Sequence, residues 1–179
     1  HMTTTQVSLH IVWAFVVAAV VGTCSGMIIR RIGIKAGLVT AGTLMFVGWT
    51  GAAFCINAGF VVLTLWACVF YAGCGMMYSP IVSTVLGTIE KDESGRGVGM
   101  NDLAMNVSPS IGIAIIGSLL GSNALGGGSI TGATGTAANY SNLLLLAGAT
   151  ALLGLIVFFC FRKKIYEGNH AVETEKAAK

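Results

Sequence analysis

Residues 9–29 read LHIVWAFVVAAVVGTCSGMII, and this stretch decides the fold class because it holds no Lys, Arg, Asp or Glu. A helix needs about 20 apolar residues to cross a hydrocarbon core of about 30 Å, since it rises about 1.5 Å per residue. Arg30, Arg31 and Lys35 follow at once, so the apolar run ends at a charged boundary. We therefore predict a transmembrane helix over residues 9–29.

Four more stretches have the length and apolar character of a span, over residues 36–56, 60–89, 100–120 and 143–161. The third is longer than a straight crossing requires, and tilt or a kink at Pro80 would absorb the excess. The sequence therefore predicts an all-α fold, an integral membrane bundle of five transmembrane helices over residues 9–161. Residues 1–8 would form an outside stretch that begins with a tag remnant at His1. Residues 162–179 would form a cytoplasmic basic tail that is frayed or weakly helical.

The composition excludes the usual soluble classes. The chain is 55% hydrophobic and 9% charged, with a mean hydropathy of +0.82, whereas soluble domains carry roughly 25% charged residues. The basic residues sit in short clusters beside apolar runs rather than along one face, so no nucleic-acid partner is expected. The five cysteines lie inside apolar stretches without metal-ligand spacing, and His10 and His170 belong to no catalytic motif. We expect no enzyme, no metal and no cofactor.

The ten basic residues occupy alternate connections between the predicted spans. They follow the first, third and fifth spans, as Arg30, Arg31 and Lys35, then Lys91 and Arg96, then Arg162, Lys163, Lys164, Lys176 and Lys179. The other connections hold none, and among them the Gly-rich segment 126–136 is expected to be a flexible loop. Because positive residues gather on the cytoplasmic side, we predict an outside N-terminus and a cytoplasmic C-terminus.

Asp102 is the one carboxylate that does not plainly belong to a cytoplasmic connection. A charge near the bilayer centre costs about 3 kcal/mol or more, so such residues usually face a cavity and mark ion or proton pathways. Alternatively, Asn101 or Asp102 caps the fourth helix, which leaves residues 103–120 as a span of sufficient length. Both interpretations stay open from the sequence.

Further polar residues accompany Asp102 in the same predicted helix. Asn101, Asn106, Ser108 and Ser110 lie beside the helix breaker Pro109 and are candidates for lining a substrate cavity. The alternative is that they hydrogen-bond a neighbouring helix. Small residues four apart predict close helix packing, namely Gly22 with Gly26, Ser108 with Gly112 and Gly117 with Gly121.

The segment 26-GMIIRRIGIK-35 resembles the loop motif of the major facilitator superfamily, G-x-L-x-D-R-x-G-R-K, because Gly26, Arg31, Gly33 and Lys35 match it. Arg30 replaces the acidic residue, a departure common in the second half of these transporters. The resemblance continues in the segments 79–81, 97–100 and 110–117. Together they are similar to the last third of fourteen-helix drug/proton antiporters, such as the tetracycline and multidrug exporters of Gram-positive bacteria.

The resemblance implies that the five spans correspond to the second to sixth helices of a C-terminal transporter half. The chain would be part of a proton-coupled exporter of drug-like or cationic substrates in a bacterial plasma membrane. Asp102 would couple to protons or cations, and Gly26, Arg30, Arg31, Gly33 and Lys35 would form a gating loop at the cytoplasmic face.

Alternating access needs two bundles around a midplane site, so we expect this chain not to transport alone. Its partners would be the lipid bilayer, protons, a small lipophilic or cationic substrate, and either a missing transporter half or further copies of itself. The rival hypothesis is a non-transporting membrane protein, a partner or assembly subunit that acts by helix association.

Overall fold

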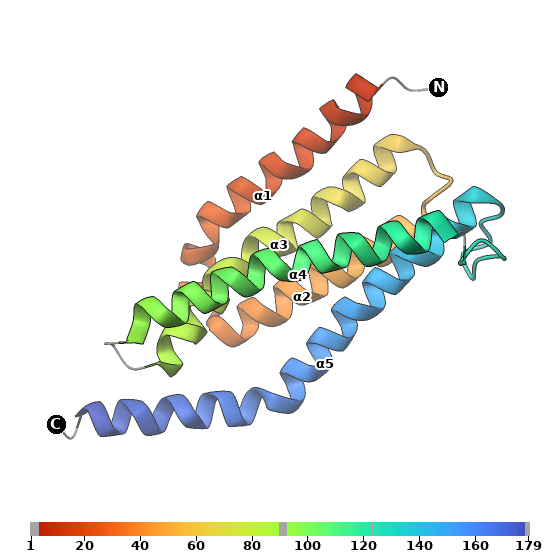
Figure 1. The fold of residues 1–179 in the computed structure, drawn as a ribbon. Helices are drawn as coiled ribbons and strands as arrows, with labels where there is room; N and C mark the ends of the chain where they lie inside the picture. Colours follow the sequence, from red (N-terminus) through yellow and green to blue (C-terminus); the bar gives the residue numbers. More distant parts are fainter. Residues whose placement is uncertain (1–3, 90–92, 123, 178–179) are drawn as a thin grey trace.

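The computed structural model describes residues 4–89, 93–122 and 124–177, with side chains for residues 8–87, 89, 93–122 and 124–161. Within these residues the chain forms five α-helices and no strand, and consecutive helices run in opposite directions (Figure 1). The helices are α1 (Thr4–Ile32), α2 (Ile34–Phe54), α3 (Phe60–Thr88), α4 (Ser94–Ser122) and α5 (Thr136–Ala177). The predicted all-α bundle is confirmed. His1, Met2, Lys91 and Lys179 lie outside the described residues.

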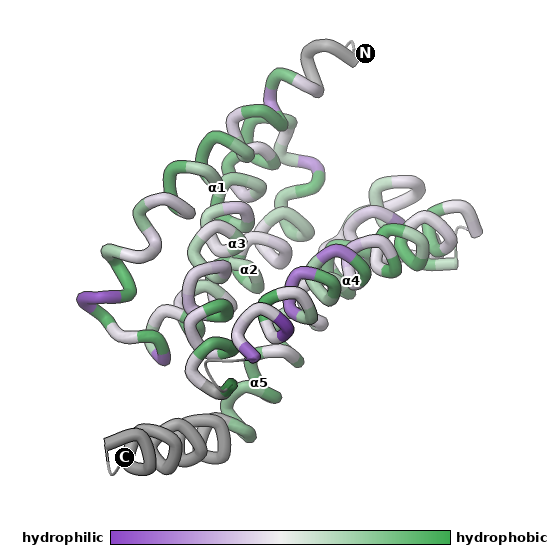
Figure 2. The backbone as a smooth tube through the Cα atoms, turned by 60° about the vertical axis from the view of Figure 1, so that its left-hand side comes forward, coloured by the Kyte–Doolittle hydropathy of each residue, from purple (hydrophilic) through white to green (hydrophobic). Residues whose placement is uncertain are grey.

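Each of the five described helices is long and apolar enough to span a membrane, over Ser8–Ile32, Ile34–Phe54, Phe60–Gly87, Ser94–Ser122 and Thr136–Phe161. Even in the best-covered span only 33% of the most apolar window is buried inside the bundle. Figure 2 shows hydrophobic positions along most of the helices, with hydrophilic ones at the α1–α2 turn and in the first half of α4. Apolar surface exposed on this scale identifies a multi-pass membrane protein whose main solvent is lipid.

The tightest packing in the bundle is the seam of α3 against α1 and α2. A Cβ atom added to Gly75 would lie 2.5 Å from the backbone oxygen of Ala18, and one added to Gly73 would lie 2.8 Å from the backbone oxygen of Ala41. Such distances require glycine, which lets helix backbones approach where lipid gives no hydrophobic drive to associate. Glycines on α3 therefore bring three helices together.

The predicted small-residue pairs are only partly used for this packing. Gly22 does face Gly75, because a Cβ atom added to Gly22 would lie 3.7 Å from the backbone oxygen of Gly75. Gly26, Gly112, Gly117 and Gly121 have no described atom within 4 Å of an added Cβ, so they pack against nothing in the bundle. For these four, the packing prediction is wrong within the described residues.

Helix α5 packs along α2 in the opposite direction. An added Cβ on Gly42 would meet the Leu155 side chain at 2.6 Å, and one on Gly148 would meet the Thr50 hydroxyl at 3.0 Å. The first two turns of α5 precede its predicted start at residue 143, and they hold Asn139 and Ser141, which are buried although polar. The helix also continues to Ala177, so the backbone of the tail is helical instead of frayed.

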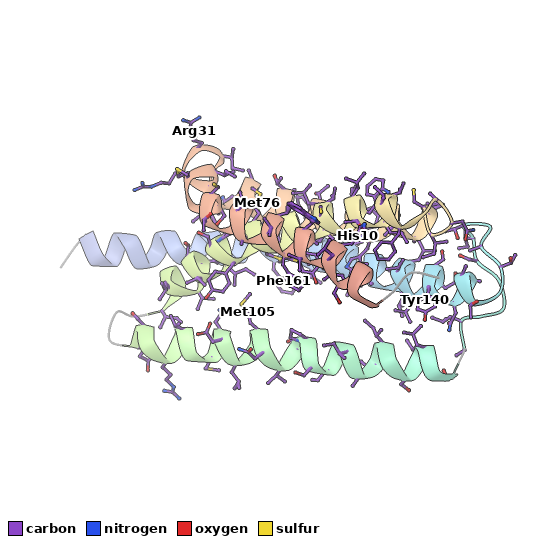
Figure 3. The ribbon with its side chains drawn as sticks, turned by 90° about the horizontal axis from the view of Figure 1, so that it is seen from above. His10, Arg31, Met76, Met105, Tyr140 and Phe161 are labelled. Carbon is purple, nitrogen blue, oxygen red and sulfur yellow. The ribbon has the colours of Figure 1, made fainter. Side chains whose placement is uncertain are left out.

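Helix α4 lies beside the other four as a separate layer (Figure 3). In its most apolar 18-residue window no residue is buried, and Ile111 and Ile113 are 56% and 71% exposed. Its contacts with the bundle are light and go to α3 and α5. The helix begins at Ser94, six residues before the predicted start.

Candidate functional site

The polar side chains of α4 separate into a row on one face and two residues elsewhere. Asp102, Asn106 and Ser110 follow one another at intervals of four residues, which places them on the same face of the helix. The amide of Asn106 donates to the backbone oxygen of Asp102 at 2.7 Å, and the Ser110 hydroxyl donates to the backbone oxygen of Asn106 at 3.0 Å. All three residues are exposed. We call Asp102, Asn106 and Ser110 the polar row.

The other two predicted cavity residues do not join the polar row. The Asn101 amide donates to the Met105 sulfur at 3.8 Å, and Figure 3 shows Met105 pointing from α4 toward the rest of the bundle. Asn101 therefore lies on the packing side of α4. Ser108 is exposed but follows Asn106 by two residues, and positions two apart in a helix do not share a face. The predicted set is thus divided among different sides of the helix.

The position of Asp102 within α4 removes one of the two interpretations of this residue. The helix starts at Ser94, so Asp102 lies about 12 Å along its axis and caps no end. Asp102 is also the only acidic residue in the five candidate spans. A carboxylate at such a position is costly unless it meets water or a polar partner. The polar row is exposed in the described bundle, and a polar environment beside it would remove this cost.

The predicted gating loop is a one-residue turn between two helices. Arg30 and Arg31 lie in the last turn of α1, and Lys35 lies in the first turn of α2. Gly33 alone separates the two helices. Its φ of 85° and ψ of 156° suit glycine and few other residues. The turn is closed on both sides by backbone hydrogen bonds, from Gly33 to Ile29 at 2.7 Å and from Gly37 to Gly33 at 2.9 Å. This makes the α1–α2 turn a compact corner.

The basic side chains stand outward from this corner. Arg30, Arg31 and Lys35 are exposed, and Figure 3 shows Arg31 directed away from the helices. Gly26 is also exposed and lies one turn earlier on α1. Arg96, near the start of α4 at the same end of the bundle, pairs with Glu93 at 3.7 Å. We call this end of the molecule the basic end.

A cluster of hydroxyl groups at the opposite end was not predicted. The Ser141 hydroxyl donates to the backbone oxygen of Ala53 at 3.1 Å and lies 2.7 Å from the Thr131 hydroxyl and 3.1 Å from that of Ser129. Asn142 donates to the backbone oxygens of Leu125 and Gly128 at 2.8 and 2.7 Å. We call Ser129, Thr131 and Ser141 the outer clasp. It fastens the Gly-rich connection to both α2 and α5, so this loop is held by specific hydrogen bonds.

The Ser and Thr residues inside the Gly-rich segment were the available signal for this cluster. Short hydroxyl side chains often bond nearby backbone groups, but their partner on α2 is distant in sequence. Next to the outer clasp, Asn139 is only 5% exposed, and its Oδ1 has no hydrogen-bond partner among the described residues. Among the described side chains, no group of three or more His, Cys, Asp or Glu could hold a metal ion.

The comparison with protein families agrees with this arrangement of five membrane-length helices. The family model described as Major Facilitator Superfamily matches residues 1–179. No curated protein and no solved structure matches the chain. Proteins of this family are transporters and not enzymes, which agrees with the expectation from the histidine and cysteine inventory. The match covers the whole chain, and the chain therefore belongs to the Major Facilitator Superfamily.

Proposed function

We propose that the chain forms part of a proton-coupled exporter of drug-like or cationic small molecules in a bacterial plasma membrane. Membership of the family indicates a transporter-type function. The observation that carries the finer proposal is Asp102, the single acidic residue in the spans, set in the polar row on the outward face of α4. An intramembrane carboxylate of this kind is the usual element of a proton relay.

The polar row has the features of one wall of a substrate pathway. Its carboxylate would attract a cation, and the amide of Asn106 and the hydroxyl of Ser110 would supply hydrogen-bonding groups along the next two turns. Because the row is exposed in the described bundle, the opposite wall would come from another bundle. That bundle would be a transporter half or a second copy of this chain.

The α1–α2 turn supports a gating role for the basic end. The compact corner at Gly33 holds the backbones of Arg31 and Lys35 near each other. Each side chain could pair with an acidic group of the opposing bundle in one conformational state and lose this ion pair in the other. With an outside N-terminus, this corner would lie at the cytoplasmic face. Charge pairs that form in only one state bias a two-state equilibrium.

Export of a lipophilic cation from cells that lack their own exporters tests this function. The chain is expressed together with the N-terminal half of a drug/proton antiporter, and export is followed with an imposed proton gradient. We expect export that disappears when a protonophore collapses the gradient, and a loss of about tenfold or more in Asp102→Asn. Asp102→Glu keeps the carboxylate and should retain most of the export.

Glu93→Gln is the matched control, because Glu93 is an exposed acidic residue outside the polar row. It should export like the unchanged protein. Unchanged export in Asp102→Asn would remove the coupling role. Export that persists without a proton gradient would contradict the proton-coupled mechanism.

The rival function, helix association without transport, is favoured by one observation. Gly117 and Gly121 leave the exposed side of α4 open to close approach by another helix. In the same cells, association of the chain with a transporter half but no export, whatever residue stands at position 102, would favour this rival. Restored export would exclude it.

A further inference from the structure

A groove between α2, α3 and α5 has no role in the transport proposal. It encloses ≈ 380 Å³ and is lined by twelve residues, all from these three helices. The α2 side consists of Leu38, Gly42, Met45 and Trp49, and α3 contributes Phe70 and Met77. The groove lies on other helices than the polar row, so it is a separate feature of the fold.

The chemistry of the lining suits a hydrocarbon. Two methionines and three aromatic rings surround the space, and such side chains adapt to flexible apolar ligands. The one hydroxyl, that of Thr150, donates to the backbone oxygen of Ala147 at 2.7 Å in its own helix. This hydrogen bond occupies the hydroxyl proton, and the groove offers a ligand little else that is polar.

The dimensions of the groove match one leaflet of a bilayer. On α2 it extends from Leu38 to Trp49, and on the antiparallel α5 from Phe158 back to Ala147. Eleven residues of helix correspond to about 16 Å, close to half of a hydrocarbon core of about 30 Å. The groove begins one turn inside the basic end, at Leu38, and ends at Trp49, about three quarters of the way along α2. A volume of ≈ 380 Å³ spread over this length is narrow, as a single chain would require.

A positive group stands one turn beyond the Leu38 end of this hydrocarbon-lined space. Lys35 is exposed and precedes Leu38 by three residues and Gly42 by seven, so it shares their face of α2. Its stem can lie along the apolar surface while the ammonium group reaches the membrane interface. The N-terminus of α2, at the same place, carries the positive end of the helix dipole, which favours an anion.

We propose that this groove binds one acyl chain of an anionic phospholipid, with the lipid phosphate held by Lys35 and the N-terminus of α2. The surrounding medium supplies this ligand, because a groove open between spans faces lipid at that depth. Charge complementarity selects an anionic headgroup. The proposal is independent of the transport cycle and of Asp102.

Quenching of Trp49 fluorescence by brominated lipids tests the site, because Trp49 lines the groove. Trp13 and Trp66 are replaced by Phe, and the full chain is placed in phosphatidylcholine vesicles with increasing fractions of lipid brominated in its acyl chains. Half-maximal quenching should need about fivefold less brominated phosphatidylglycerol than brominated phosphatidylcholine. Lys35→Gln should remove this preference, and both lipids should then quench alike.

Filling the groove gives the second arm of the experiment. An added Cβ at Gly154 meets no atom within 4 Å, so Gly154→Phe can place its ring in the groove and should reduce Trp49 quenching by both lipids. Leu153→Phe is the matched control, since the neighbouring Leu153 is 63% exposed on another side of α5. If circular dichroism shows reduced helicity in Gly154→Phe, Gly154→Leu replaces it as the groove-filling variant.

Two results would overturn the proposal. One is equal half-quenching fractions for phosphatidylglycerol and phosphatidylcholine in the protein that retains Lys35. The other is Trp49 quenching in a folded Gly154 variant that equals quenching in Leu153→Phe, which would indicate that protein, such as α4 or a second copy, covers the groove instead of lipid.

Discussion

Helices α3 and α4 have the same length, 29 residues, and both contain a proline and several glycines, yet they meet their surroundings in opposite ways. On α3, Gly73 and Gly75 lie so close to neighbouring backbones that a Cβ atom would clash. On α4, the glycines at 112, 117 and 121 face open space. Glycine content alone therefore does not tell whether a membrane helix is packed.

The difference indicates where each helix finds its partner. Helix α3 finds its packing partners within the described bundle, since its glycines pack closely against the backbones of α1 and α2. Helix α4 leaves the glycines at 112, 117 and 121 without a close neighbour and exposes the polar row, and a polar row does not face lipid without cost. Transport as we propose it would use this unsatisfied side, while the α3 seam would keep the bundle rigid.

The sharpest test of the comparison is the exchange of matched glycines for leucine. Gly75→Leu places a side chain against the Ala18 backbone and should destabilise the protein by about 3 kcal/mol, because a helix must move to admit it. Gly117→Leu adds the same side chain to α4 in open space and should change stability by less than about 1 kcal/mol. Unfolding of the purified variants in mixed micelles measures both. Equal effects would erase the distinction between the two helices.

The next effect concerns the corner between α1 and α2. Gly33→Ala forces an L-residue into a conformation reserved for glycine and should cost about 2 kcal/mol. Gly26→Ala, about two turns earlier in regular helix with no atom within 4 Å of the added Cβ, is the control and should be neutral or slightly stabilising. Thermal unfolding of the two variants compares them directly. A tolerated Gly33→Ala would contradict the compact corner.

A smaller loss is expected at the outer clasp. Ser141→Ala removes a buried hydroxyl that serves Ala53, Thr131 and Ser129, and should cost about 1.5 kcal/mol. Amide hydrogen exchange should also become faster in the segment 126–136. Ser122→Ala, which loses an exposed bond within α4, is the control. If both variants exchange alike, the clasp does not hold the loop.

The smallest effect is expected where α4 begins. Glu93→Gln breaks the exposed pair with Arg96, and such surface pairs contribute between zero and about 0.5 kcal/mol. The midpoint of thermal unfolding should therefore hardly change between low and high salt or between the two proteins. A large shift would mean that α4 is anchored by charge at its start, which would revise its description as lightly held.

Spans could be predicted from the sequence because lipid selects for continuous apolar stretches, a property visible in one dimension. Helix starts were predicted less well. The predicted fourth span begins at residue 100, where the apolar stretch begins and where Asn101 or Asp102 could act as a cap, and Gly95, Gly97 and Gly99 before it disfavour a helix by propensity. In the bundle those glycines are helical, and only then is Asp102 seen to be internal.

Partners across the bundle could not be predicted from spacing. Small residues four apart identify a possible seam, but nothing in Gly117 and Gly121 says whether a helix faces them. The buried Ser141 and Asn139 precede the apolar run of α5, and the partner of Ser141 on α2 is distant in sequence. Asp102, Asn106 and Ser110 were each named from the sequence but not as one row, and a spacing of four residues on α4 unites these three and separates Ser108.

The outer clasp also constrains the order of assembly in the membrane. The hydrogen bond from Ser141 to Ala53 joins residues 88 positions apart. During synthesis, which proceeds from the N-terminus, α2 is made long before its partner serine exists. The end of α2 therefore lacks this hydrogen bond until the start of α5 has been made.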